Sequence, residues 1–194
     1  REKIQFELTR ADIIIKHVPY WGVDKNGIGY VRITKFSKNT AKDFSTAIQD
    51  LLDDDMEGLV IDLRGNSGGL LSKSINILDK LTERSVNLLN TKGRILKSNK
   101  EMNSRRAPMV GNEIPIAVLI NRSSASASEI VSGVLQDLDR AVIVGEKSFG
   151  KGLVQSMYNL NDTTTLKVTT AKYYTPSGRL IQKEDYLNNG FLTD

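Results

Sequence analysis

The sequence has no cysteine and a single histidine, and both scarcities limit the chemistry available to its 194 residues. Without cysteine there is no disulfide, no thiolate nucleophile and no cysteine-bound zinc. The lone His17 cannot build a site of several histidine ligands, and the sequence predicts neither a metal site nor a cofactor. Because His17 lies among Ile13, Ile15 and Val18, we interpret it as a packed or interfacial residue rather than a catalytic base.

Long apolar runs and runs of like charge are also missing. No stretch of 18 apolar residues and no amino-terminal signal segment is visible, which leaves membrane association open. The 27 basic and 23 acidic residues give a formal net charge of +4 and are spread along the chain. Basic residues are not interleaved with aromatic ones, so charge does not indicate nucleic-acid binding.

What the sequence does contain is a succession of alternating and helical apolar patterns. Helices are expected after Asn39 or Thr40, over 70–81, and around 130–138, and residues 85–110 are expected to hold a short strand and an exposed loop. Strands are expected at 3–8, 29–36, 59–63, 114–120, 141–144, 152–160 and 164–174. This order predicts an α/β domain with a mostly parallel central sheet, flanking helices and right-handed crossovers.

Ligand and catalytic sites in such sheets form at the carboxyl ends of the strands, and three unusual turns follow predicted strands. The first turn, residues 64–69, contains Gly65, Gly68 and Gly69. Glycine permits positive φ and a close approach of a ligand to the backbone. Exposed amides near a helix start would stabilise an anion or an oxyanion, and the alternative is a tight strand–helix turn without a ligand.

The second turn, residues 121–128, is crowded with hydroxyl groups after an apolar strand. Ser126 and Glu129 fit the capping pattern Ser-x-x-Glu, so one interpretation is that Ser126 only caps a helix. A serine at a helix start is also placed as a nucleophile beside free amides. In that case the amide of Ala127 would help to bind an oxyanion.

The third turn, residues 145–152, nearly matches a phosphate-binding loop through Gly145, Gly150 and Lys151. Gly152 stands where that loop needs a hydroxyl, and a strand-like stretch follows where it needs a helix. Nucleotide binding is therefore the least favoured hypothesis.

A serine nucleophile needs a base, and this chain offers no cysteine and one poorly placed histidine. Lys151, between two glycines, is expected to point into a cleft where desolvation favours the neutral amine. A neutral lysine can act as a general base near neutral pH. A Ser–Lys dyad is the chemistry left available, and a solvated turn lysine is the alternative.

The three turns, in this order, resemble the carboxy-terminal processing peptidases, also called tail-specific proteases. These are serine peptidases related to the tricorn protease core and to retinoid-binding proteins. The resemblance extends over residues 28–182. It rests on Gly29–Ile33 with Phe36, Asp62–Gly69, Ser124–Ile130, Val144–Gln155 and Tyr174–Arg179.

The resemblance implies a crotonase/ClpP-like ββα core and a role for each matched residue. Ser126 corresponds to the family's nucleophile, Lys151 to its general base, and Gln155 to the glutamine that orients this lysine. The oxyanion amides would be those of Ala127 and of Gly68 or Gly69. Four residues along a strand would place Lys151 and Gln155 on the same face.

The same resemblance implies an endopeptidase that cleaves proteins or peptides with exposed carboxy termini, in a bacterial periplasm, cell envelope or equivalent extracytoplasmic location. Residues 1–12 are expected to be the last strand of a truncated PDZ domain or a linker, and 13–194 the peptidase core. We therefore interpret the chain as a piece of a longer precursor. The main alternative is a non-catalytic binding module on the same scaffold, as in the retinoid-binding relatives.

Overall fold

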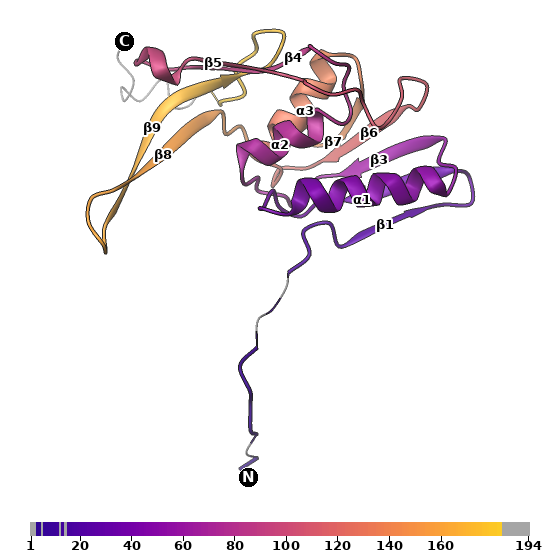
Figure 1. The fold of residues 1–194 in the computed structure, drawn as a ribbon, viewed down its shortest axis with the longest axis horizontal. Helices are drawn as coiled ribbons and strands as arrows, with labels where there is room; N and C mark the ends of the chain where they lie inside the picture. The colour runs from indigo at the N-terminus through magenta and orange to yellow at the C-terminus, as the bar shows by residue number, and fades with distance from the viewer. Residues whose placement is uncertain (1–2, 5, 12, 14, 184–194) are drawn as a thin grey trace.

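The computed structural model describes residues 3–4, 6–11, 13 and 15–183, which form two β-sheets and three α-helices (Figure 1). The central sheet has the strand order β1-β2-β3-β6-β7. Its strands are β1 (Tyr20–Val23), β2 (Ile28–Arg32), β3 (Gly58–Asp62), β6 (Ile116–Ile120) and β7 (Val142–Gly145). All neighbours in this sheet are parallel except β1 and β2. The predicted α/β class with a mostly parallel sheet is confirmed.

The helices α1 (Thr40–Asp53), α2 (Leu71–Leu78) and α3 (Ala127–Asp137) connect the parallel strands. Because the strand order runs steadily from β2 to β7, right-handed crossovers put all three helices on one face of the sheet. The core lies between this layer and the sheet. It includes Phe44 and Ile48 of α1 and Ile130 of α3, none of which is exposed. No helix in the described ranges is long and apolar enough to cross a membrane.

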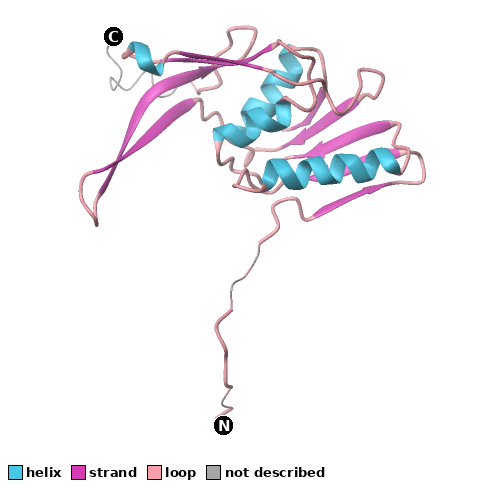
Figure 2. Cartoon of the chain, in the orientation of Figure 1, coloured by secondary structure: helices cyan, strands magenta, loops and turns pink. Residues whose placement is uncertain are grey.

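A second sheet has the order β5-β4-β9-β8, and its pairs are antiparallel. It consists of β4 (Asn87–Lys92), β5 (Lys100–Asn103), β8 (Leu153–Asn159) and β9 (Thr165–Tyr174), with a 3₁₀ turn η1 (Leu96–Ser98) between β4 and β5. Figure 2 shows the β8–β9 hairpin extending away from the helical layer. This sheet brings residues 90–92 beside 172–174, a pairing that separate local patterns do not predict.

Two local expectations were wrong. The strand expected at 3–8 is absent from its described residues, and Ile4 and Phe6 are 77% and 76% exposed. Alternation alone does not make a strand, because the backbone groups also need a neighbouring strand to bond. Conversely, no strand was expected between residues 8 and 29, but β1 lies there and pairs with β2, with Tyr20 opposite Arg32. The boundary expected between residues 12 and 13 stays a prediction, and residues 184–194 lie outside the described part.

Candidate active site

Ser126 is the N-cap residue of α3, and its backbone is strained. Its φ is 54° and its ψ is −110°, a conformation that residues other than glycine rarely adopt. Such strain persists only where the surrounding structure enforces it, and it is common at functional sites. Ser126 also forms a capping box with Glu129. The capping interpretation is therefore confirmed as local structure, and it is compatible with a nucleophile at the same position.

Glu129 connects the second turn to the third. Its Oε2 accepts the backbone N–H of Ser126 at 2.7 Å and that of Lys151 at 2.8 Å. Its Oε1 accepts the Ser148 hydroxyl at 2.7 Å and the Gly150 N–H at 2.5 Å. Glu129 is 4% exposed, and a buried carboxylate needs such a full set of donors. One side chain thus sets the backbone positions of both predicted dyad residues.

Asn66 connects the first turn to the second. The residue is fully buried, and its amide donates to the carbonyl of Ile33 at 2.9 Å. Its side-chain oxygen accepts the Gly68 N–H at 2.8 Å. Its own carbonyl accepts the Ala125 N–H at 3.0 Å and the Ser128 hydroxyl at 2.8 Å. All three turns are therefore joined by hydrogen bonds through two buried residues, the backbone carbonyl of Asn66 and the side chain of Glu129.

Gly68 lies directly against the backbone around Ser126. At its φ of +100°, a Cβ atom would lie 2.7 Å from the Ala125 carbonyl oxygen and 2.9 Å from Ser126 Cβ. Gly69 has a φ of +142°, and a Cβ there would lie 2.1 Å from the carbonyl oxygen of Phe36. Only glycine fits either position. These two residues are the predicted oxyanion candidates of the first turn.

The amides around Ser126 differ in what they bind. The Gly68 N–H is already donated to Asn66. The N–H groups of Gly69 and Ala127 donate to no other residue in the described part of the chain. Their hydrogen-bonding capacity is thus available to another acceptor.

Lys151 is half-buried and lies two residues before β8, whereas Gln155 lies within β8 opposite Thr169 and is exposed. No hydrogen bond joins their side chains within residues 15–183. The strand begins at Leu153 rather than at 152, so Lys151 is outside it and strand alternation does not relate the two side chains. A strand, not a helix, follows Lys151. The third turn therefore lacks the helix that a phosphate-binding loop needs, as the sequence predicted.

The segment 181–183 packs against the glycines that flank Lys151. Gln182 Oε1 accepts the N–H of Gly152 at 3.0 Å, and the Lys183 N–H donates to the carbonyl of Gly150 at 3.1 Å. A Cβ on Gly152 would lie 2.5 Å from the Gln182 nitrogen. Sequence reasoning missed Gln182. The only local indication was the pair of glycines, which is typical of a close backbone approach.

Asp62, at the end of β3, fixes the start of the first turn. It accepts the Tyr30 hydroxyl at 2.6 Å, the Arg64 guanidinium at 3.0 and 2.8 Å, and the Arg64 N–H at 2.9 Å. Burial by itself would raise the pKa of Asp62, but the hydrogen bonds from Arg64 and Tyr30 outweigh it and keep the pKa below the ordinary 3.8. The carboxylate is therefore charged at neutral pH.

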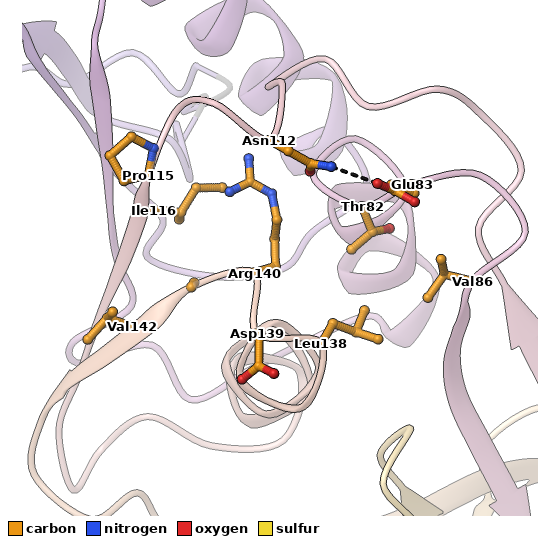
Figure 3. Close-up of a pocket in the computed structure, with 11 residues that line it drawn as sticks. Thr82, Glu83, Val86, Asn112, Pro115, Ile116, Leu138, Asp139, Arg140 and Val142 are labelled. Atoms are coloured by element: carbon orange, nitrogen blue, oxygen red, sulfur yellow. Dashed lines mark hydrogen bonds between the residues drawn. The ribbon is translucent and has the colours of Figure 1, made fainter.

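A well-formed pocket lies elsewhere. It measures about 610 Å³ and is lined by residues such as Glu83, Asn112, Leu138 and Arg140 (Figure 3). None of its lining residues belongs to the three turns. The candidate site is therefore defined by the three hydrogen-bonded turns and not by this pocket.

Residues that sequence reasoning set aside do not join the site either. His17 lines a separate pocket with Trp21 and Asn39. Within the described ranges there is no group of three or more histidine, aspartate or glutamate residues that could bind a metal ion.

Comparison with known proteins identifies the family to which the chain belongs. The profile of peptidase family S41 matches residues 27–189. The carboxy-terminal-processing protease of Bartonella bacilliformis is 40% identical over 183 residues, which cover 92% of this chain and 41% of the relative. The carboxyl-terminal-processing protease of Picosynechococcus is 41% identical over 183 residues, covering 91% and 42%.

A solved structure, the photosystem II D1 C-terminal processing protease, superposes with a TM-score of 0.76 at 32% identity. The alignment covers 90% of this chain and 47% of that one. The chain thus spans about two fifths of the length of the curated relatives it matches. The resemblance to the carboxy-terminal processing peptidases is confirmed, and this chain belongs to peptidase family S41.

Proposed function

We propose that this chain is the catalytic core of a serine endopeptidase that cleaves protein substrates near their carboxy termini. The observation that carries the proposal is the Glu129 carboxylate, whose Oε2 binds the backbone of Ser126 and of Lys151. A strained, helix-capping serine and a lysine from another turn are thereby positioned by a single buried group. Membership of peptidase family S41 and the names of the relatives support the reaction type.

In the proposed mechanism, the neutral amine of Lys151 takes the proton of the Ser126 hydroxyl. The Ser126 oxygen attacks the carbonyl carbon of the scissile peptide bond. Lys151 returns the proton to the leaving amine, and the carbon–nitrogen bond breaks to leave an acyl ester on Ser126. Water then attacks this ester with Lys151 again as base, which releases the carboxylate product and restores the serine.

The oxyanion of each tetrahedral intermediate would accept hydrogen bonds from the N–H groups of Ala127 and Gly69. Both amides are free of other described acceptors, whereas the Gly68 amide is donated to Asn66. Gly69 is therefore a better candidate than Gly68. Gln155 is proposed to orient the Lys151 amine because it matches the family's glutamine, although the two side chains make no hydrogen bond within the described residues.

We also propose an extracytoplasmic location and substrates that are proteins or peptides with exposed carboxy termini. Support comes from the relatives, which include a bacterial carboxy-terminal-processing protease and a C-terminal processing peptidase of Tetradesmus obliquus named as chloroplastic.

The test is cleavage of an unstructured protein by the wild-type chain and by Lys151→Ala. We expect Lys151→Ala to abolish cleavage while circular dichroism shows an unchanged fold. Lys167→Ala, on the exposed face of β9, is the matched control and should cleave normally. Near-normal cleavage by Lys151→Ala would contradict the dyad. If the wild-type chain binds the unstructured protein without cleaving it, the non-catalytic binding module is favoured instead.

A further inference from the structure

A pocket of about 360 Å³ lies where α1, α2 and the loop after β5 meet, and it is strongly basic. Figure 1 shows α2 beside α1, and the two helices are in contact. Six cationic side chains line this basic pocket: Lys38, Lys42, Lys73, Lys80, Arg105 and Arg106. The only acidic lining residue is Asp79. The pocket therefore carries a net +5, while the whole chain carries +4, so the rest of the chain is close to neutral.

None of these six basic groups forms an ion pair with an acidic side chain in the described part of the chain. The ion pairs found there join Arg64 to Asp62, Arg122 to Glu146 and Arg179 to Asp137. Asp79 does not pair with a basic side chain. Its Oδ1 accepts the backbone N–H of Arg105 at 2.5 Å and of Arg106 at 3.2 Å, which attaches the loop to α2.

The like charges are crowded as well as unpaired. Lys80 is half-buried, and its burial together with the neighbouring Arg106 charge lowers its pKa. Grouping cations in a concave surface opposes folding by mutual repulsion, and a bound anion relieves that repulsion. An anion is thus the ligand class that the electrostatics favour.

The lining residues also favour a compact anion over an apolar or membrane-inserting ligand. Lys73, Asn76 and Lys80 follow at spacings of three and four residues, so they share one side of α2 and its extension. The exposed side-chain amide of Asn76 is available as a further donor. Ala41 is the only apolar lining residue, which leaves no surface to bury an acyl chain. Several separated cationic donors in a concavity match the multiple acceptor oxygens of a phosphate group.

We propose that the basic pocket binds a phosphate-bearing anion, at a site separate from Ser126 and Lys151. None of its lining residues belongs to the three turns of the candidate active site. This site does not depend on the proposed peptidase activity, and either proposal can fail without the other. The phosphate can belong to a soluble compound or to a lipid headgroup, and the experiment below distinguishes these two sources.

The experiment measures binding of inorganic pyrophosphate to the chain by calorimetry at low ionic strength. The pocket variant carries Lys73→Gln, Lys80→Gln and Arg106→Gln together. The control carries Arg94→Gln, Lys97→Gln and Lys167→Gln, three exposed residues outside the pocket, and loses the same charge. We expect saturable binding by the wild-type chain, at least tenfold weaker binding by the pocket variant, and a change of less than twofold in the control. Removal of like charges should also leave the pocket variant at least as resistant to urea as the wild type.

Vesicles containing phosphatidic acid, compared with phosphatidylcholine vesicles, form the second arm. Sedimentation with the acidic vesicles that is lost only in the pocket variant would assign the phosphate to a headgroup. Pyrophosphate binding without vesicle binding would assign it to a soluble compound. The proposal is overturned if pyrophosphate does not bind saturably or if both variants weaken binding equally. It is also overturned if polyglutamate binds the pocket as tightly as pyrophosphate, since that would indicate an acidic peptide site.

Discussion

The Glu129 carboxylate accepts the backbone N–H of Lys151 at 2.8 Å, although the two residues are 22 positions apart in the chain. The same carboxylate oxygen accepts the N–H of Ser126 at 2.7 Å. The relative position of the proposed nucleophile and base thus depends on a residue that the mechanism itself does not use.

Replacing Glu129 by glutamine is expected to destabilise the chain and to lower peptidase activity. Glutamine has one acceptor oxygen and one donor nitrogen, so two of the four donors around Glu129 would face another donor. Leaving buried donors unsatisfied costs about 1–3 kcal/mol each, and we expect a loss of about 2 kcal/mol in the free energy of unfolding. Urea denaturation measures it. Glu57→Gln, at an exposed position, is the control. Equal stability of the two variants would show that Glu129 does not organise the turns.

Gly68→Ala is expected to disturb the site more than Gly65→Ala, although both residues have positive φ. A Cβ at Gly68 would lie 2.7 Å from the Ala125 carbonyl oxygen, whereas a Cβ at Gly65 would meet nothing within 4 Å. The backbone strain is thus shared, and the steric clash is confined to Gly68. We expect Gly68→Ala to lose roughly 1–3 kcal/mol more stability than Gly65→Ala. Similar urea midpoints for the two variants would contradict the close contact between the first and second turns.

The stability of the chain should depend on the ionisation of Asp62 in acid. The pKa of Asp62 in the folded chain lies below the ordinary 3.8, because hydrogen bonds from Arg64 and Tyr30 outweigh the effect of burial. The unfolded chain therefore binds this proton first as the pH falls. The stabilisation from Asp62 is complete above about pH 4 and is lost as the pH falls through 3.8 toward the folded-state pKa.

Asp62→Asn is accordingly expected to be less stable than the wild type at pH 7. The gap between the two chains should narrow as the pH falls below about 4. Urea unfolding from pH 7 to pH 2.5 measures this, and Asp54→Asn at the exposed end of α1 controls for the loss of one negative charge. A gap that stays constant over the whole range would exclude the proposed linkage.

Gln182 is expected to act as a positioning residue for Lys151. Its side-chain oxygen accepts the N–H of Gly152, so Gln182→Ala leaves this amide without its partner beside the proposed base. We expect kcat to fall about tenfold, equivalent to about 1.4 kcal/mol, with little change in KM. Gln182→Glu keeps an acceptor oxygen and should recover most of the activity. Gln49→Ala, on exposed α1 surface, is the control. A rise in KM alone would indicate a role in substrate binding instead.

Sequence patterns were sufficient where the deciding interactions are local. The apolar periodicity of α1 and the run Leu59–Leu63 predict their elements because a buried helix face or a buried strand needs only its own residues to show the pattern. The order of strands and helices likewise predicts a parallel sheet. The scarcity of histidine and cysteine, together with the family motifs, was sufficient to propose Ser126 and Lys151.

Tertiary structure decided whatever depends on partners far apart in the chain. Residues 3–8 alternate like a strand and form none, while β1 forms because β2 lies beside it. Sequence spacing could show Glu129 as a capping partner of Ser126, but not that the same carboxylate binds Lys151. Nor could it show that Gln182 packs on Gly152, since the fold alone brings position 182 back to the third turn. Hydrogen bonds depend on distances in space. The sequence therefore determined which residues are suited to the chemistry, and the fold determined which of them meet.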